Sequence, residues 1–188
     1  MWGVYFHIVD LYLNDKGVID TLLSQASVPL INYMVKAPEV FKTQQFNNQG
    51  TPLDMLLNYI AKCFSDGDAL DDENLTMTGI SLIMACLEHL GEGMGQIIHQ
   101  INGFYLQAMQ NGQSRHLKNM LVQGVMMNLW YEQSTTIQSL KEHGAFEKVL
   151  GYIFENLTEM DRDFEVKRLV LGLSSLICDP NISEPIVT

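Results

Sequence analysis

The chain has 188 residues, of which 47% are hydrophobic and 18% are charged, so it can bury a sizeable core and is not intrinsically disordered. Its 22 acidic side chains outnumber 11 basic ones and give a formal net charge of −11. A nucleic-acid-binding module needs clustered Lys and Arg to neutralise phosphates, so this balance argues against direct nucleic-acid binding and favours basic partners.

Residues 2–14 predict an apolar helix that is neither a signal peptide nor a membrane span. They lack a basic leader and a small-residue cleavage site, and His7 and Asp10 interrupt the apolar run. We therefore expect no membrane insertion and a location in the cytosol or nucleus. A chain that begins on so apolar a helix looks cut, so we expect residues 1–188 to be one segment of a longer protein.

The next helix is expected over 18–34, and Pro29 predicts a bend or a break within it. Pro38 ends this helical pattern. Residues 41–50 are polar and rich in turn formers, so they predict a connection between helices.

A helix start follows the connection. Thr51 is the expected N-cap, Pro52 occupies the first helical position and Asp54 lies in the first turn. The apolar side chains that share one face of this helix are Leu53, Leu56, Leu57, Ile60 and Phe64.

A cluster of carboxylates follows this helix, without Lys or Arg among them. It cannot be an EF-hand, because Leu70 occupies a ligand position and Asp71 stands where the sharp turn needs Gly. Two interpretations remain: a solvated loop that favours the next helix N-terminus, or a contact surface for a basic partner. The members are Asp66, Asp68, Asp71, Asp72 and Glu73.

The second half of the chain predicts a series of helices separated by glycine and polar turns. The glycines of 91–95 follow a helix and lack the Lys-Ser/Thr of a phosphate-binding loop, so they indicate a helix stop. Period-two alternation persists nowhere, so no sheet is expected. Helices are expected over 75–90, 94–109, 117–130, 135–142, 145–157 and 164–178.

Residues 165–177, EVKRLVLGLSSLI, carry apolar side chains at three- and four-residue spacing with a glycine in the middle. Gly172 predicts a neighbouring helix too close for a Cβ. Gly79 and Gly124 stand in similar contexts upstream, and the 45- and 48-residue spacings of the three are close to the period of HEAT repeats, about 40–47 residues. We predict an all-α fold, an α-solenoid of HEAT-like antiparallel helix pairs with about four pairs and one orphan helix. An unrelated all-helical bundle is the alternative.

Methionine and aromatic side chains gather in the helix expected over 117–130. Core packing explains them, or they lie in a groove between helix pairs that accepts an apolar side chain of a partner. The groove candidates are Met126, Met127, Trp130 and Tyr131.

The chain lacks recognisable catalytic and metal-binding motifs. Cys63, Cys86 and Cys178 stand far apart without a C-x-x-C pair and are expected to be reduced core residues. The histidines are scattered, and Ser174 and Ser175 lack a nucleophile elbow. A four-helix enzyme would need inward-facing Glu and His pairs, which the core stripes lack. We expect no metal, no cofactor and no enzymatic activity.

Several segments resemble late HEAT repeats of the importin-beta superfamily, closest to the importin seven and eight group. They are EVKRLVLGLSSLI, the preceding FEKVLGYIFENLTEMDRDF and MLVQGVMMNLWY, and the opening MWGVYFHIVDLYLNDKGVIDTLLSQASVPLINYMV, in the same order. The resemblance covers nearly the whole chain and consists of helix pattern and order.

The resemblance implies part of a nuclear transport receptor that binds protein cargo, here expected to be basic, for Ran-dependent passage through the nuclear pore. Contact with Ran and with nucleoporins would come through the full-length receptor, which would shuttle between cytoplasm and nucleus and meet the pore at the nuclear envelope. A non-transport HEAT-repeat scaffold that joins two proteins is the rival interpretation.

Overall fold

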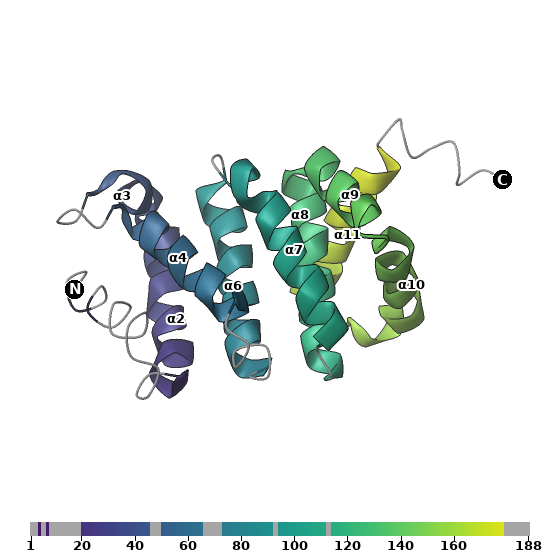
Figure 1. Ribbon diagram of the computed structural model, residues 1–188, viewed down its shortest axis with the longest axis horizontal. Coiled ribbons are helices and arrows are strands. Elements are labelled where there is room, and N and C mark those ends of the chain that lie inside the picture. Colours follow the sequence, from purple (N-terminus) through teal and green to yellow (C-terminus); the bar gives the residue numbers. More distant parts are fainter. Residues whose placement is uncertain are drawn as a thin grey trace. The chain divides into compact units, whose positions relative to one another are not determined.

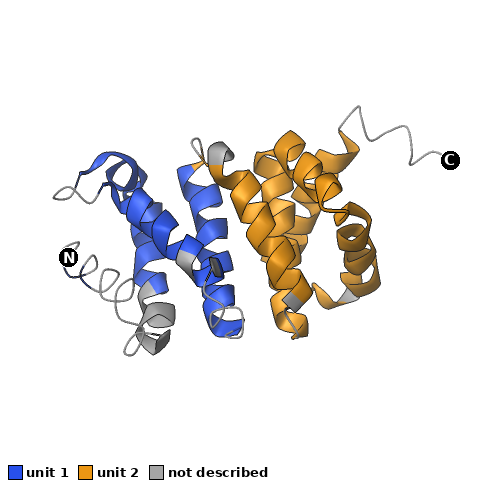
Figure 2. Cartoon of the chain, viewed as in Figure 1, with its two compact units in different colours: residues 1–90 blue, residues 91–188 orange. Residues whose placement is uncertain are grey.

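The computed structural model describes Val4, His7 and residues 20–45, 50–65, 73–91, 94–111 and 114–178 (Figure 1). Every regular element in these ranges is a helix, so the predicted all-α class is confirmed. The chain divides into two compact units, residues 1–90 and 91–188 (Figure 2). The helix predicted over 2–14 lies outside the described residues, apart from Val4 and His7, which are helical.

In unit 1, helix α6 packs against both α2 and α4, and the short α3 contacts all three. The helices of this unit are α2 (Asp20–Lys36), α3 (Pro38–Thr43), α4 (Pro52–Ser65) and α6 (Glu73–Leu90). Because α6 is buried along most of its length, it forms the centre of the unit's core.

Helix α2 continues through Pro29, so a break there is wrong, and the alternative of a bend stays a prediction. Proline in a helix interior costs about 3 kcal/mol, but packing on both sides of it can offset that cost. Leu30 and Met34 are buried after the proline, and the Cys86 thiol of α6 lies 3.7 Å from the Met34 sulfur. Tertiary contact with α6 therefore holds the C-terminal half of α2 in the helix.

The connection predicted over 41–50 begins later than expected, because α3 occupies Pro38–Thr43. Pro38 stands in the first turn, where its missing N–H has no helical partner to lose. Phe41 is fully buried. Burial of this single aromatic side chain thus places an otherwise polar segment against the core. The polar composition of the segment gives no indication of that contact.

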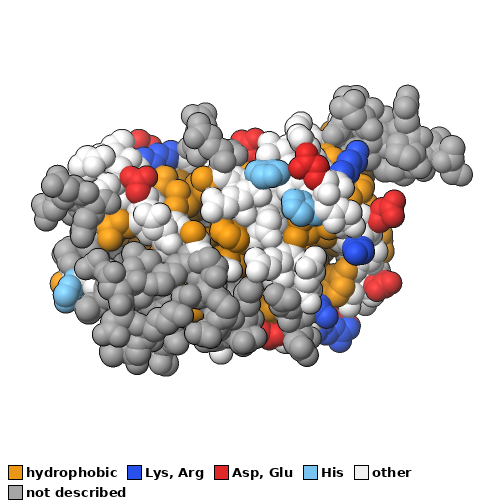
Figure 3. Space-filling model, in the orientation of Figure 1, with side chains coloured by type: hydrophobic (Ala, Val, Ile, Leu, Met, Phe, Trp, Pro, Cys, Tyr) orange, Lys and Arg blue, Asp and Glu red, His pale blue; other side chains and the backbone are white. Residues whose placement is uncertain are grey.

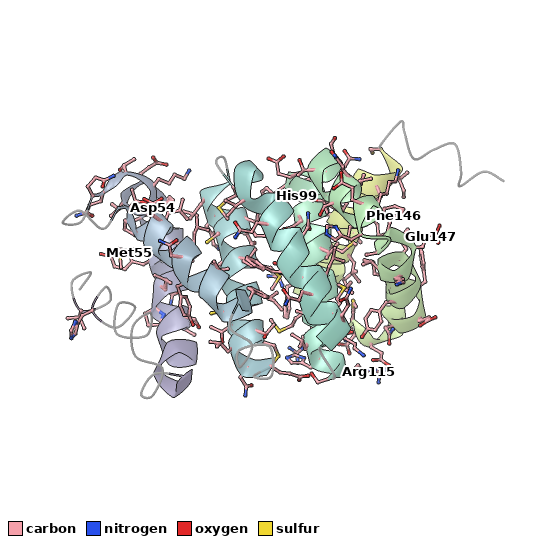
Figure 4. The ribbon with its side chains drawn as sticks, in the orientation of Figure 1. Asp54, Met55, His99, Arg115, Phe146 and Glu147 are labelled. Carbon is pink, nitrogen blue, oxygen red and sulfur yellow. The ribbon has the colours of Figure 1, made fainter. Side chains whose placement is uncertain are left out.

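The predicted start of α4 is confirmed by a reciprocal pair of hydrogen bonds. The Thr51 backbone N–H donates to Asp54 Oδ2 at 2.8 Å, and the Asp54 backbone N–H donates to Thr51 Oγ1 at 3.1 Å. Asp54 lies at the beginning of the helix (Figure 4). The pair satisfies two backbone donors that a helix N-terminus leaves without partners.

The buried face of α4 differs from the predicted one by a rotation about the helix axis. Leu56, Ile60 and Phe64 are buried as expected, whereas Leu53 and Leu57 are half-buried. A second buried row, which the prediction lacked, consists of Met55, Tyr59 and Cys63.

In unit 2, helix α8 is central and contacts α7, α9 and α11, while α9 also packs against α7. The predicted boundaries agree with the observed ones to about two residues, the usual uncertainty of helix ends. The elements are α7 (Gly95–Asn111), α8 (Arg115–Tyr131), α9 (Gln133–Glu142), α10 (Phe146–Asn156), the 3-10 helix η1 (Leu157–Glu159) and α11 (Asp163–Ile177).

Helices α7 and α8 run antiparallel, because the contacts move down one helix as they move up the other. Asn128 Nδ2 donates to Asn102 Oδ1 at 2.9 Å, and Gly124 faces the Tyr105 ring. Both asparagines are fully buried, so their hydrogen bond fixes the register of the pair in an apolar setting.

Helices α8 and α11 run parallel. Gln123 Nε2 donates to Glu165 Oε1 at 3.2 Å near the start of α11, and the Ser175 hydroxyl donates to the Leu129 carbonyl at 2.8 Å near its end. Partners in these contacts are 42 and 46 residues apart in the chain.

The close helix approach predicted at Gly172 is confirmed, and the two related glycines behave similarly. A Cβ at Gly172 would lie 2.7 Å from the Met126 carbonyl oxygen of α8. At Gly124 it would lie 2.7 Å from the Tyr105 ring, and at Gly79 it would lie 3.0 Å from the Phe64 ring. Each glycine therefore lets two helices of its own unit approach within a distance that a side chain would prevent.

Cysteine burial agrees with the prediction at two positions of three. Cys63 and Cys86 are buried free thiols, whereas Cys178 at the end of α11 is exposed, so its assignment to the core is wrong. The periodic pattern continues to the end of α11, but its last turn reaches solvent.

We expect iodoacetamide to modify Cys178 in the native protein while Cys63 and Cys86 stay protected until the chain unfolds, since a buried thiol is neither accessible nor ionised. Peptide mass mapping after timed labelling measures the three rates. Labelling of Cys63 or Cys86 as fast as Cys178 would contradict the burial.

Candidate binding pocket and exposed surfaces

The predicted acidic contact surface lies almost wholly outside the described residues. Asp66, Asp68, Asp71 and Asp72 fall there, and only Glu73 is described, as the first residue of α6 with a partly exposed side chain. A carboxylate in this first turn favours the helix dipole, as predicted. Its role as a partner contact stays a prediction.

The four predicted groove residues fall into two environments on α8. Met126 and Met127 are buried in the core of unit 2, as core packing predicts. Trp130 is 47% exposed and Tyr131 is 36% exposed at the C-terminal end of the helix, so core packing does not hold these aromatic rings.

A polar bridge joins α8 to α11 at the N-terminal end of α11. Buried Glu165 accepts from Gln123, and Arg168 donates to Gln123 Oε1 at 2.9 Å. The Arg162 backbone N–H donates to the second Glu165 oxygen at 3.3 Å. The buried carboxylate therefore has partners on both oxygens, which offsets the cost of removing it from water.

The apolar stripe of α11 divides between the core and the surface. Leu169 and Leu176 are buried against unit 2, together with Gly172. On the other edge of the stripe the side chains are open to solvent: Val166 is 43% exposed, Val170 is 55% exposed and Ile177 is 75% exposed. An exposed apolar row of this kind is typical of an interaction surface.

A cavity of about 280 Å³ lies within unit 2, between α7, α8 and α10. Its apolar surface comes from Leu106 and Met109 of α7, Val122 of α8 and Val149 of α10. On the face shown in Figure 3, apolar side chains between α7 and α10 reach the surface beside Lys or Arg side chains. The cavity thus combines an apolar lining with a polar rim.

The rim of this cavity is cationic. Lys118 of α8 and Lys148 of α10 both line it, and neither forms an ion pair with an acidic side chain of the described residues. The lining residues include no Asp or Glu. In a chain with a net charge of −11, two unpaired ammonium groups at one cavity form a local positive site.

Two further polar side chains that line the cavity are held by hydrogen bonds. His143 lies in the turn before α10, and its Nδ1 donates to the Ser139 carbonyl at 2.8 Å. The Tyr152 hydroxyl donates to Asn119 Oδ1 at 3.0 Å and so ties α10 to α8. Burial raises the pKa of Tyr152, and the Arg115 charge partly offsets the rise, so the hydroxyl stays protonated at neutral pH.

The N-terminal ends of α8 and α10 flank this region. Arg115 begins α8 and pairs with Glu159 of η1, while Phe146 and Glu147 begin α10 (Figure 4). Ala145, the N-cap of α10, lines the cavity and has no side chain that could accept a hydrogen bond from the first turn. An anionic group in the cavity would therefore meet the N-terminal dipole of α10 as well as the two lysines.

The sequence holds no signal that joins these cavity residues. Lys118 and Lys148 are 30 positions apart on different helices, with ordinary exposed-lysine contexts around each. Only the folding of α10 back towards α8 brings them to one cavity. The nearest criterion that a sequence offers is a lysine beside apolar positions in an otherwise acidic chain.

Metal and membrane sites find no support in the described residues. No group of three or more His, Cys, Asp or Glu side chains there could hold a metal ion. None of the helices in the described ranges combines the length and apolar character that crossing a bilayer requires.

No protein-family model, curated protein or solved structure matches the chain. The similarity to the importin-beta superfamily therefore stays a prediction that rests on helix pattern and order.

Proposed function

We propose that the chain is a protein-binding segment of an α-solenoid, built from HEAT-like helix pairs. The observation that carries this proposal is the parallel packing of α8 on α11 through residues 42–46 positions apart. Stacked repeats place corresponding helices side by side and parallel, one repeat period apart, and HEAT units are about 40–47 residues long.

The remaining contacts of unit 2 support the same arrangement. Helix α7 packs against α9 while α8 packs against α11, as expected where two successive pairs form two layers. In unit 1, α6 packs against α4, with which it forms a helix pair. It also packs against α2, a helix that comes before this pair in the chain. The exposed row on α11 is the kind of surface on which a further helix or a partner protein packs.

The finer proposal is that this segment helps a nuclear transport receptor to bind protein cargo for Ran-dependent passage through the nuclear pore. Its support is the resemblance in sequence together with the helix pairing. Such a segment acts through shape and charge rather than bond chemistry, because small rotations between stacked pairs add up to a change in curvature that grips or releases cargo. A HEAT-type scaffold would share the same architecture.

The acidic cluster is the proposed contact for basic cargo, and its neutralisation tests the proposal. We expect the variant that carries Asn at the four aspartates and Gln at Glu73 to bind a histone-tail peptide more slowly and with a flatter salt dependence. The reason is that five carboxylates attract a basic chain over about a Debye length, roughly 8 Å at physiological salt. Stopped-flow fluorescence with a labelled peptide at several salt concentrations measures both quantities.

A matched control removes the same amount of charge from exposed acidic residues elsewhere. It carries Gln or Asn at Glu88, Glu142, Glu147, Glu155 and Asp161, all of which are exposed. If the control slows association as much as the cluster variant does, the effect reflects net charge, and the cluster is only a solvated loop. Unchanged binding in the cluster variant would have the same meaning.

A further inference from the structure

The cavity of unit 2 lies at the lower end of the size range of ligand sites, and its volume suits a single large side chain. Cavities for drug-sized ligands span roughly 300–1,000 Å³, and this one holds about 280 Å³. The buried side chains of Leu106, Val122 and Val149 form its apolar wall. An apolar group that enters it would be removed from water on most sides, which is how a binding hot spot forms.

The positive charge at the rim of the cavity determines which kind of partner segment can insert an apolar side chain there. Lys118 is half-buried and Lys148 is exposed at the rim, and none of the described residues that line the cavity carries a carboxylate. Carboxylates next to the inserted group would pair with these ammonium groups. A basic segment would instead bring like charges together, which makes the cavity a different site from the acidic cluster.

We propose that this cavity binds an acidic peptide segment of a partner protein, which inserts one aromatic or large aliphatic side chain and places flanking carboxylates against Lys118 and Lys148. The inference deepens the proposed protein-binding function by giving one partner its chemistry. It does not depend on nuclear transport or on the binding of basic cargo.

The test is a titration of the full methyl-labelled chain with the acetylated peptide Glu-Asp-Phe-Glu-Asp, followed by NMR. We expect saturable shifts that centre on the methyl groups of Leu106, Val122 and Val149. Replacing the Phe of the peptide by Ala, or the acidic residues by Lys, should abolish them. Saturable shifts centred elsewhere, or equal binding of the Lys peptide, would overturn the proposal.

Charge-reversal variants separate the local effect from net charge. We expect Lys118→Glu combined with Lys148→Glu to weaken binding by about tenfold, because two attractive charge pairs at the rim become repulsive. The control combines Lys36→Glu with Lys167→Glu, which makes the same change in net charge at exposed positions outside the cavity. Equal weakening in both variants would show that no specific contact exists.

Two further measurements show whether the cavity binds a peptide side chain or a small organic acid. Ala145→Leu narrows the cavity without removing a core side chain, and it should weaken binding of the Phe peptide while the helical circular dichroism is retained. If 3-phenylpropionate binds as tightly as the peptide, the site is for small acids and the peptide proposal is wrong. The absence of saturable shifts with the Phe peptide would also overturn the peptide proposal, and it would leave the histone-peptide test unaffected, because that test concerns different residues and the opposite charge.

Discussion

Replacing Gly172 by Ala is expected to lower the free energy of unfolding by about 1–3 kcal/mol, the usual cost of overpacking a core. The added Cβ would lie 2.7 Å from the Met126 carbonyl oxygen and 2.8 Å from its Cα. Backbone atoms cannot rotate away as a flexible side chain can, so α8 and α11 would have to separate. Urea denaturation followed by Trp130 fluorescence, in a Trp2→Phe background, measures the change.

The matched control is Gly151→Ala in the middle of α10. A Cβ there meets no atom within 4 Å, so the substitution should be neutral or should stabilise the helix by up to about 1 kcal/mol. Gly79→Ala should fall between the two, since its nearest contact is the Phe64 ring at 3.0 Å. Equal stability of the Gly172 and Gly151 variants would contradict the close packing of α8 and α11.

Stability is expected to fall as the pH rises above about 9, partly because of one buried thiol. Burial raises the pKa of Cys86 from 9.0 to about 12. Between these values the unfolded chain loses the thiol proton and the folded chain keeps it, so alkaline pH favours unfolding. One such group lowers the free energy of unfolding by about 1.4 kcal/mol per pH unit in this range. Below pH 9 the thiol is protonated in both the folded and the unfolded chain, so its titration no longer changes stability.

The difference in the free energy of unfolding between wild type and Cys86→Ala isolates the effect of the thiol, because the lysines and tyrosines titrate in both proteins. Denaturant unfolding at pH 8, 9, 10 and 11 gives the free energies of unfolding. We expect the stability advantage of wild type over the variant to shrink steadily above pH 9. Parallel pH profiles for the two proteins would show that the thiol ionises equally in the folded and unfolded chains.

Local features of the chain could be predicted from the sequence because each depends on neighbours along it. The hydrogen bonds between Thr51 and Asp54 are an example, since a helix start needs only residues three positions apart. Helix periodicity likewise predicted α8 and α11, with small errors at the ends. Gly172 was informative because a mid-helix glycine has a local cost that only a close neighbour explains.

The sequence-based predictions are wrong where contacts between segments that are distant in the chain determine the local structure. Pro29 stays within α2 because Met34 packs beside Cys86, and the polar segment at Phe41 becomes helical because one ring reaches the core. In α11 the apolar stripe is wider than the surface that α8 can cover, so Val170 and Ile177 remain exposed. Periodicity shows which side chains share a face and leaves open how much of that face a neighbour buries.

By itself, the sequence determined the helical class, the order of the helices, the turns between them and the excess of negative charge, because backbone propensity, capping and net charge are properties of short segments or of composition. Only the tertiary structure decided which lysines converge. Lys118 and Lys148 line one cavity because α10 folds back on the α7 and α8 pair, and no short-range interaction encodes that meeting. The candidate site is therefore a product of packing between helices that are distant in the chain.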